Sequence, residues 1–553
     1  MKTFYWYDFE TFGISPKIDR ISQFAGIRTD ENLNILDEHM FYCKPTHDCL
    51  PSPEACAVTG ISPQLCEQKG MIEHKFIKKI HEQISAPNTC TAGYNSIRFD
   101  DEFTRYTLYR NFLDPYAWHW QNGNTRWDIL DVVRMCYALK KETSFKWVYK
   151  QYIKCQLVGF YWGKREGKKA IILKIRNTDD HEYEIANNWE DQVGKIFNQL
   201  SKFNGEMIGY STFGDHSNLE WFENIELWSN SLNKEYPIFK LDRLSPANGI
   251  EHSNAHDALA DVRATIAIAK IIKESQPQLF DYAFKLREKK FVESSINLFE
   301  PMLHTSGMYP AQKSCTRLSV ALAYHPEYKD RVIVFNLDQD PSILLELSAD
   351  ELKVLMFTKQ SELPKNVERL QIKDLIFNKS PMFVPNIYKI EPKVVEQLQI
   401  DMVTCLKHLD FIKDNQLAIE KVVQNLYKND QGFEKSTDAD QSLYDGFMDN
   451  ADKRIAEQIQ TLNIEQLKNF HPKFKDEKLS NLLIHFKARN YPESLTEDEA
   501  ENWFETVQGR VQTGENGYLS VDDYLQRIHN MREQHPQKET LWRQLESYGE
   551  SFF

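Results

Sequence analysis

The run TFYWYDFETFG at residues 3–13 constrains the fold of this chain more than any other stretch. Its aromatic residues have high β-propensity, so the run predicts a buried strand. Asp8 and Glu10 come at the end of that strand, and because side chains alternate between its two faces, both carboxylates lie on the same face. Two neighbouring carboxylates beside a core are costly unless a cation lies between them. The run therefore predicts oxygen ligands for a divalent metal, against the alternative of a D-x-E pair at a solvated turn, which is common by chance.

Composition sets the size and class of the protein. A chain of 553 residues is expected to hold several domains, since single cores rarely exceed about 250–300 residues. We expect neither a membrane span nor secretion, because the sequence has no long apolar stretch and no basic-then-apolar leader. Nine cysteines without a C-x-x-C pair indicate a reduced, cytoplasmic protein. The net charge of −14 argues against non-specific coating of nucleic acid, but not against a local basic groove.

The first 276 residues have the mixed pattern of an α/β domain. Stretches rich in β-branched and aromatic residues alternate with stretches whose apolar residues recur at helical spacing. After the opening strand, the predicted strands cover residues 21–29, 38–43 and 90–94, and the predicted helices begin at residue 63 and cover residues 72–84, 101–111, 127–139 and 255–274. Ser253 and Asn254 are good N-cap residues for the last of these helices.

Residues from about 141 to 236 interrupt this pattern. A hairpin at 170–176 and 182–185 and amphipathic helices at 189–203 and 217–232 predict an inserted α+β subdomain. Its run FYWGKREGKK, residues 160–169, places aromatic residues directly before basic ones. That run fits either a flap that grips a strand or a solvated surface.

Two further domains are predicted after the α/β domain. Residues 277–427 contain strand-like stretches around a His-Pro turn, which predict a small β-barrel or sandwich. Residues 428–553 predict helices throughout, and Thr496 and Ser520 begin patterns of the capping-box form.

Two more acidic clusters follow the first. Asp100 stands at a strand-to-helix junction, where a side chain at the helix start can point into a cleft. The adjacent Asp101 and Glu102 are explained as capping residues of the first helical turn. Asp261 lies on a mostly apolar helix, where an aspartate is expensive unless it is paired or bound to metal. His256 is either a structural hydrogen-bonding residue or a general base that takes up a proton near neutral pH.

These residues suit two-metal phosphodiester hydrolysis. Two cations about 3.5–4 Å apart clamp the attacking and leaving oxygens while a base deprotonates the water. Hard oxygen ligands without a thiolate favour Mg²⁺ or Mn²⁺. Asp8, Glu10, Asp100 and Asp261 are the candidate ligands, and His256 is the candidate base.

The order of these motifs resembles that of the DEDDh exonucleases, whose fold is ribonuclease-H-like. Asp8 and Glu10 give D-x-E, Asp100 ends N-x(3–4)-F-D, and His256 and Asp261 give H-x(4)-D. Longer stretches are similar to bacterial exonuclease I; these are FYCKP at 41–45, YRNF at 109–112, DPYAW at 114–118, RWD at 126–128, NGIEHSNAHD at 248–257, FDY at 280–282 and KARNYP at 487–492. The resemblance covers nearly the whole chain apart from the insertion.

The resemblance implies a 3′→5′ exonuclease that degrades single-stranded DNA to nucleoside 5′-monophosphates in DNA repair or recombination. It implies an α/β, ribonuclease-H-like exonuclease domain with a mixed sheet (1–276), a small Src-homology-3-like β-barrel (277–427) and an all-α C-terminal domain (428–553), which close a groove around the strand. It also implies two Mg²⁺ ions, replaceable by Mn²⁺, and a monomer. A further implied partner is the acidic, phenylalanine-ended tail of single-stranded-DNA-binding protein, for which Lys487 and Arg489 are candidate rim residues.

Carried over residue by residue, the resemblance makes the four carboxylates metal ligands and His256 the general base. It also implies substrate-binding residues, of types that contact phosphates or stack on bases. These are Glu10, Arg105, Tyr116, Trp120, Arg134, Lys240, Tyr282 and Lys289. For each of these residues except Glu10, the alternative is that the side chain packs in a core or lies on a solvated surface. Lys240 stands where the family has an arginine, which keeps the charge but loses the planar fork.

Two other functions stay open at this point. An exoribonuclease of the same superfamily would differ in accepting the 2′-hydroxyl. A non-catalytic scaffold that binds single strands would be expected to have lost at least one of the five catalytic residues, and all five are present.

Overall fold

The computed structural model divides the chain into two compact units, Met1–Trp147 with Phe239–Phe553, and Val148–Ile238. It describes residues 2–150, 155–165, 168–177, 182–188, 225–226, 236–252, 257–360, 362–364, 367–428 and 435–552. Within these ranges, no helix combines the length and apolarity that crossing a lipid bilayer requires.

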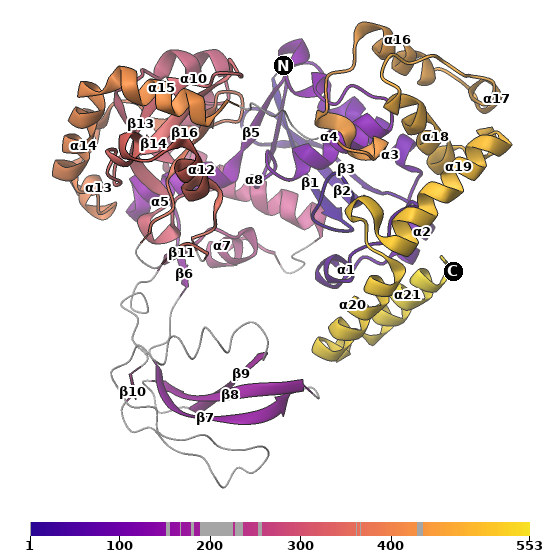
Figure 1. The fold of residues 1–553 in the computed structure, drawn as a ribbon, viewed down its shortest axis with the longest axis horizontal. Coiled ribbons are helices and arrows are strands. Elements are labelled where there is room, and N and C mark those ends of the chain that lie inside the picture. The colour runs from indigo at the N-terminus through magenta and orange to yellow at the C-terminus, as the bar shows by residue number, and fades with distance from the viewer. Residues whose placement is uncertain are drawn as a thin grey trace. The chain divides into compact units, whose positions relative to one another are not determined.

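A mixed five-stranded sheet forms the centre of the first domain (Figure 1). Its order is β3–β2–β1–β4–β5, and β1 pairs antiparallel with β2 and parallel with β4. The strands are β1 Thr3–Thr11, β2 Ile21–Thr29, β3 Ile35–Tyr42, β4 Thr89–Gly93 and β5 Thr125–Asp128. Tyr5 and Trp6 are fully buried, so the prediction of a buried opening strand is confirmed.

Alternation along β1 separates the two faces of this sheet. Tyr5, Tyr7 and Phe9 pack on one face in a core shared with α3 and α4. Phe4 packs against Phe284 on the other face, where α8 crosses β1. The helices of this domain are α1 Pro53–Thr59, α2 Pro63–Lys69, α3 Glu73–Ile84, α4 Asp100–Arg110, α5 Ile129–Ser144, α7 Leu241–Ala247, α8 Ala258–Ser275 and α9 Pro277–Lys285. By the same alternation, the side chains of Asp8 and Glu10 lie on the face of the sheet that α8 covers.

Two predicted helix starts are wrong. Residues 127 and 128 finish the short strand β5, and α5 begins at Ile129 with Asp128 as its N-cap. Likewise α8 begins at Ala258, and its N-cap is Asp257, whose carboxylate accepts from two backbone N–H groups. The predicted caps Ser253 and Asn254 lie outside the described residues.

The second part of the large unit, called here the barrel domain, is a five-stranded antiparallel sheet with helices packed around it. Its strand order is β15–β14–β13–β12–β16. The strands are β12 Pro301–Thr305, β13 Thr316–Tyr324, β14 Arg331–Asn336, β15 Ile372–Ile376 and β16 Met382–Val384, and the helices are α10 Lys289–Ser295, α11 Ile343–Glu346, α12 Ala349–Phe357, α13 Pro392–Gln397, α14 Met402–Asp414 and α15 Gln416–Leu426. Leu318 and Phe335 pack against Leu409 and Val423 in one core. The predicted strand-rich domain is confirmed, and β12 and the packed helices are additions to it.

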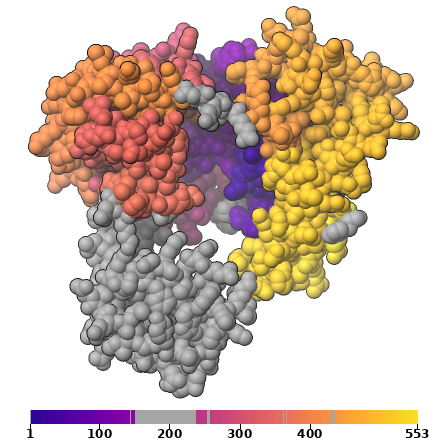
Figure 2. Space-filling view, viewed as in Figure 1, coloured from indigo at the N-terminus to yellow at the C-terminus, as the bar shows by residue number. Residues whose placement is uncertain are grey.

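The described residues from 435 to 552, called here the helical domain, contain helices and no strand. After the 3₁₀ segment η6, Ala439–Tyr444, the helices are α16 Asn450–Ile459, α17 Ile464–Lys468, α18 Lys478–Asn490, α19 Glu497–Gln508, α20 Val521–Gln534 and α21 Glu539–Glu550. Thr496 forms a complete capping box with Glu499, as its sequence predicts, and Ser520 caps α20. In Figure 2 the indigo surface of the first domain lies between the barrel domain and the yellow helical domain.

The described residues of the smaller unit form strands. Its sheets have the orders β10–β7–β8–β9 and β11–β6. The strands are β6 Val148–Lys150, β7 Cys155–Arg165, β8 Lys168–Asn177, β9 Glu182–Asn188, β10 Ile225–Glu226 and β11 Tyr236–Ile238. The predicted hairpin is confirmed as β8–β9. The helix predicted at 217–232 is wrong at 225–226, because these residues pair with β7, and the helix predicted at 189–203 lies outside the described residues.

Buried ion pairs join the helical domain to the first domain. Asp48 lies 3.0 Å from Arg20 and 2.5 Å from Arg510. Arg510 and Arg489 also pair with Asp440, at 2.6 and 2.5 Å. These five side chains are at most 3% exposed. Burial alone raises the pKa of Asp48, but Arg20, Arg489 and Arg510 outweigh it and hold that pKa well below its ordinary value.

Asp48→Ala is expected to lower the free energy of unfolding by about 3–5 kcal/mol, because it leaves buried arginines without their partner. Urea unfolding of the full chain measures this. Lys393→Ala, which breaks a pair whose side chains are 68% and 69% exposed, is the control and should cost less than about 1 kcal/mol. Equal effects of the two substitutions would contradict the importance of the buried network.

Candidate metal centre

Four acidic side chains from three separate segments meet at the end of β1. Ligand oxygens of Asp8, Glu10 and Asp261 all lie within 4.8 Å of one another. Asp100, the first residue of α4, accepts a hydrogen bond from the backbone N–H of Phe9 at 3.0 Å, between the two β1 carboxylates. The structure therefore brings together all four carboxylates that the sequence predicts as ligands.

The loop that delivers Asp100 is held by a residue that sequence reasoning did not assign a role. The Asp128 carboxylate accepts from the backbone N–H of Asn95 at 2.9 Å and of Ile97 at 3.2 Å, and it also caps α5. Asn95 has φ of 68°, a left-handed conformation that asparagine tolerates better than most residues. The signal in the sequence was the acidic residue of the RWD stretch, directly after a short strand.

The carboxylates repel one another in a poorly solvated place. Burial, followed by the charges of Asp261 and Asp100, raises the pKa of Glu10 to about 9. Burial and the charge of Asp100 likewise raise the pKa of Asp8 well above its ordinary value. Burial also raises the pKa of Asp100, although the hydrogen bond from Phe9 opposes this. An all-oxygen donor set with this excess of negative charge fits a hard divalent cation.

The histidine predicted as general base, His256, lies outside the described residues. A different histidine, His252, has its Nε2 2.5 Å from Oδ1 of Asp261. Nothing in the sequence distinguishes His252 from its neighbours, because the contact joins residues on either side of a helix start. Asp257, between them in sequence, caps α8 and adds to the negative charge around Asp8.

The sequence predicts that Asp101 and Glu102 cap α4, but their side chains do not bond to the helix end. Asp101 accepts from the Tyr7 hydroxyl at 2.6 Å and pairs with Arg126 at 2.7 Å. Glu102 pairs with Arg105 at 2.7 Å and accepts from a tyrosine hydroxyl of the helical domain. Both residues do lie in the first turn, but their side chains bond to other elements rather than to the helix end.

Two of the predicted strand-binding residues, Arg105 and Tyr116, contact each other. Arg105 is 5% exposed, and its guanidinium carbon lies 5.7 Å from the centre of the Tyr116 ring. The Tyr116 ring in turn packs edge-on against Phe447 of the helical domain, at 5.6 Å. Trp120, four residues after Tyr116, is 61% exposed. A cation and accessible aromatic faces are the combination that single-stranded nucleic acid uses.

The other predicted strand-binding residues have different surroundings. Arg134 pairs with Asp131 at 2.5 Å. The hydroxyl of Tyr282 donates to the backbone of β16 at 2.8 Å. Lys240 and Lys289 are exposed.

The predicted rim residues Lys487 and Arg489 are wrong for a surface site. The Lys487 side chain is fully buried and pairs with Glu499 at 2.8 Å. Arg489 is 1% exposed and belongs to the buried network around Asp48 and Asp440. Both are helical-domain core charges, which a docking peptide could not reach without unfolding the domain.

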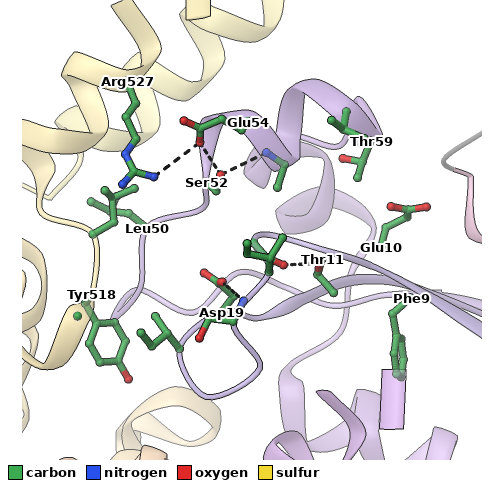
Figure 3. A pocket seen from close by; sticks show the side chains of 18 of the residues that line it. Phe9, Glu10, Thr11, Asp19, Leu50, Ser52, Glu54, Thr59, Tyr518 and Arg527 are labelled. Atoms are coloured by element: carbon green, nitrogen blue, oxygen red, sulfur yellow. Dashed lines mark hydrogen bonds and ion pairs between the residues drawn. The ribbon is translucent and has the colours of Figure 1, made fainter. Parts of the chain in front are cut away.

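A cavity of about 580 Å³ opens beside Glu10 (Figure 3). Its wall includes the end of β1, the following loop and helix α1, and Figure 3 shows Tyr518 and Arg527 of the helical domain on the side away from Glu10. Ser52 donates to Glu54 at 2.6 Å, and Arg527 lies 3.8 Å from the same carboxylate. The cavity is therefore built by both domains.

A second acidic cluster does not fit a cation. Asp438, Asp440 and His485 are close enough to share an ion. However, Arg510 pairs with both aspartates, at 2.8 and 2.6 Å. The positive guanidinium already neutralises these carboxylates, so the cluster is a structural one.

Known protein families and relatives match most of the chain. Family models described as "Exonuclease", "Exonuclease I SH3-like domain" and "Exonuclease I C-terminal domain" match residues 5–154, 287–429 and 437–552. Exodeoxyribonuclease I of Haemophilus influenzae is 35% identical over 551 residues, covering 99% of this chain and 98% of the relative. The E. coli exonuclease I structure in complex with a dA16 oligonucleotide has a TM-score of 0.80 at 32% identity and covers 100% of both chains. A zinc-bound E. coli ExoI–ssDNA complex also has a TM-score of 0.80 at 32% identity, covering 100% of this chain and 99% of that one.

The metal-free protein is expected to lose stability as the pH rises. Folded Glu10 keeps its proton up to about pH 9, whereas the ordinary pKa of a glutamate is 4.5. Between these values the folded state binds more protons than the unfolded state, so the free energy of unfolding falls as the pH rises. Glu10→Gln removes this titration, and its melting temperature in chelator should fall less than that of the wild type between about pH 5 and about pH 9. Glu346→Gln, on an exposed helix position, is the control. A wild-type pH slope in Glu10→Gln would contradict the assignment.

Proposed function

Since this chain belongs to the exonuclease I family, we propose that it removes nucleotides one at a time from the 3′ end of single-stranded DNA and releases nucleoside 5′-monophosphates. The observation that carries this proposal is the convergence of Asp8, Glu10, Asp100 and Asp261 at one end of β1. Likeness along nearly the whole chain to exodeoxyribonuclease I supports the substrate class. DNA repair or recombination is the proposed setting.

The four carboxylates are the proposed ligands of two Mg²⁺ ions, for which Mn²⁺ can substitute. When bound, the ions supply the Lewis acidity that activates water and neutralises charge on the leaving oxygen. The chain's own part is to hold Asp100 against the backbone of β1 and to keep Glu10 buried, which fixes the donor oxygens in advance. His256 is the proposed general base, from the family resemblance. It takes the proton of a water whose oxygen bonds to phosphorus while the P–O3′ bond breaks. The leaving oxygen takes a proton from solvent, which leaves a 3′-hydroxyl on the shortened strand.

The strand is proposed to run from the carboxylates over the surface that carries Arg105, Tyr116 and Trp120. Aromatic faces stack on any base, and cations pair with any phosphate, so these contacts need no particular sequence. Arg134, Lys240, Tyr282 and Lys289 are further binding residues on the family pattern. The cavity beside Glu10 is the proposed place of the terminal nucleotide.

Asp8→Asn tests the chemistry with little change of shape. With 5′-labelled single-stranded DNA and Mg²⁺, the wild type should give a ladder that shortens from the 3′ end, and the variant should be slower by about 10³-fold or more. The neutral amide also relieves repulsion, so the variant should melt no lower than the wild type. If both proteins bind the strand but neither shortens it, the chain is a scaffold. Equal digestion of a matched RNA oligonucleotide would instead favour an exoribonuclease.

Trp120→Ala tests the proposed strand path. Affinity for a labelled single strand, measured in chelator by fluorescence anisotropy, should fall by about 1–3 kcal/mol, because one stacking face is lost. Phe504→Ala on α19 is the matched control, since Phe504 and Trp120 are both 61% exposed. Equal affinity of the two variants would remove Trp120 from the path.

The remaining proposals rest on the family pattern. They are a monomer acting in the cytoplasm, binding of the tail of single-stranded-DNA-binding protein at a site other than Lys487 and Arg489, and domain limits at about residues 276 and 427. The family-model matches, which begin at 287 and 437 for the later two domains, support that division.

A further inference from the structure

His252 is buried beside the carboxylate cluster. Its side chain is 1% exposed, and its Nε2 lies 2.5 Å from Oδ1 of Asp261, whose own side chain is 19% exposed. Ligand oxygens of Asp261, Asp8 and Glu10 lie within 4.8 Å of one another. His252 therefore contacts a carboxylate of the cluster from a position that solvent does not reach.

The direction of this hydrogen bond follows from the chemistry of the two groups. A carboxylate only accepts, so Nε2 of His252 carries the proton. Nδ1 is buried and has no hydrogen-bond partner in the described part of the chain. The hydrogen bond to Asp261 therefore requires only that Nε2 carries a proton.

A donor on the Asp261 carboxylate opposes the repulsion inside the cluster. Its neighbours in the cluster, Asp8 and Glu10, are also acidic. Once they lose their protons to bind a metal ion, repulsion among the three carboxylates favours any rotamer that moves the Asp261 carboxylate away. Because Asp261 is partly exposed, packing alone does not fix that rotamer. A carboxylate has two oxygens, so a hydrogen bond at one is compatible with a metal ion at the other.

We propose that His252 is a positioning residue of the metal centre, which holds the Asp261 carboxylate in its ligand orientation by donating from Nε2. This rests on the proposed function only in taking Asp261 as a metal ligand. Its role is to act through Asp261, which is its hydrogen-bond partner. Residues that orient metal ligands in this way typically contribute about 10–100-fold to metal affinity.

The test compares three substitutions of His252 by Mn²⁺ binding to the full chain without DNA, followed from the electron paramagnetic resonance of free Mn²⁺. His252→Ala removes the donor and should weaken binding by about 10–100-fold. His252→Gln places an N–H at about the reach of imidazole Nε2 and should bind within about threefold of the wild type. His252→Asn has the same amide on a shorter stem and should behave like the alanine variant.

A buried histidine elsewhere separates positioning from general loss of stability. His304, in β12, is 2% exposed, and its Nδ1 lies 2.9 Å from the Tyr309 hydroxyl. His304→Ala should lower the melting temperature without changing Mn²⁺ affinity. In nuclease assays, His252→Ala should raise the Mg²⁺ concentration for half-maximal rate by the same factor as the Mn²⁺ dissociation constant, while KM for the strand at saturating Mg²⁺ stays unchanged.

The outcomes separate this inference from the proposed function. Wild-type Mn²⁺ affinity in His252→Ala, or binding by the glutamine variant as weak as by the alanine variant, would overturn the positioning role. A wild type that binds no Mn²⁺ would overturn it as well. If the Mn²⁺ pattern is as expected but the wild type shortens no DNA strand, His252 keeps its role and the proposed nuclease function fails.

Discussion

Repulsion between four carboxylates is the constraint on which this structure depends. Asp8, Glu10 and Asp100 are placed where burial favours their neutral forms, and Asp261 joins Asp8 and Glu10 from the first turn of α8. Strand β1 is central in its sheet, and it supplies two of the four. A backbone N–H of the same strand holds the third. The central strand of the sheet thus holds the acidic groups that repel one another.

Much of this centre follows from the sequence because its determinants are local. Alternation on a strand places Asp8 and Glu10 on one face, and apolar surroundings mark Asp261 as an aspartate that needs a partner. The succession of an α/β, a strand-rich and a helical region also follows from the sequence, through the spacing of its apolar residues. The order of the motifs then resembles a known family, and the comparisons bear that out.

What the sequence could not predict depends on pairing between distant residues. Strand β5 has four residues, too few for alternation to show, and its identity comes from pairing with β4. Ile225 belongs to a strand because Leu157 pairs with it, although its own segment has helical spacing. The roles of Asp128 and His252 are likewise set by partners that lie beyond a turn. Lys487 has the composition of a surface residue, and only the tertiary fold shows it buried beside Glu499.

The buried pairs of Asp48 have a consequence for how the chain is made. Arg489 and Arg510 stand more than four hundred residues after Asp48, as the separation of 462 residues between Asp48 and Arg510 shows. During synthesis the first domain leaves the ribosome while Asp48 has only Arg20 beside it, and most of its neutralising charge does not yet exist. The first domain therefore completes its charge balance only when the last helices emerge. A chain that stops before residue 489 contains all four acidic residues of the centre but lacks the helical-domain residues, such as Tyr518 and Arg527, that line the cavity beside Glu10.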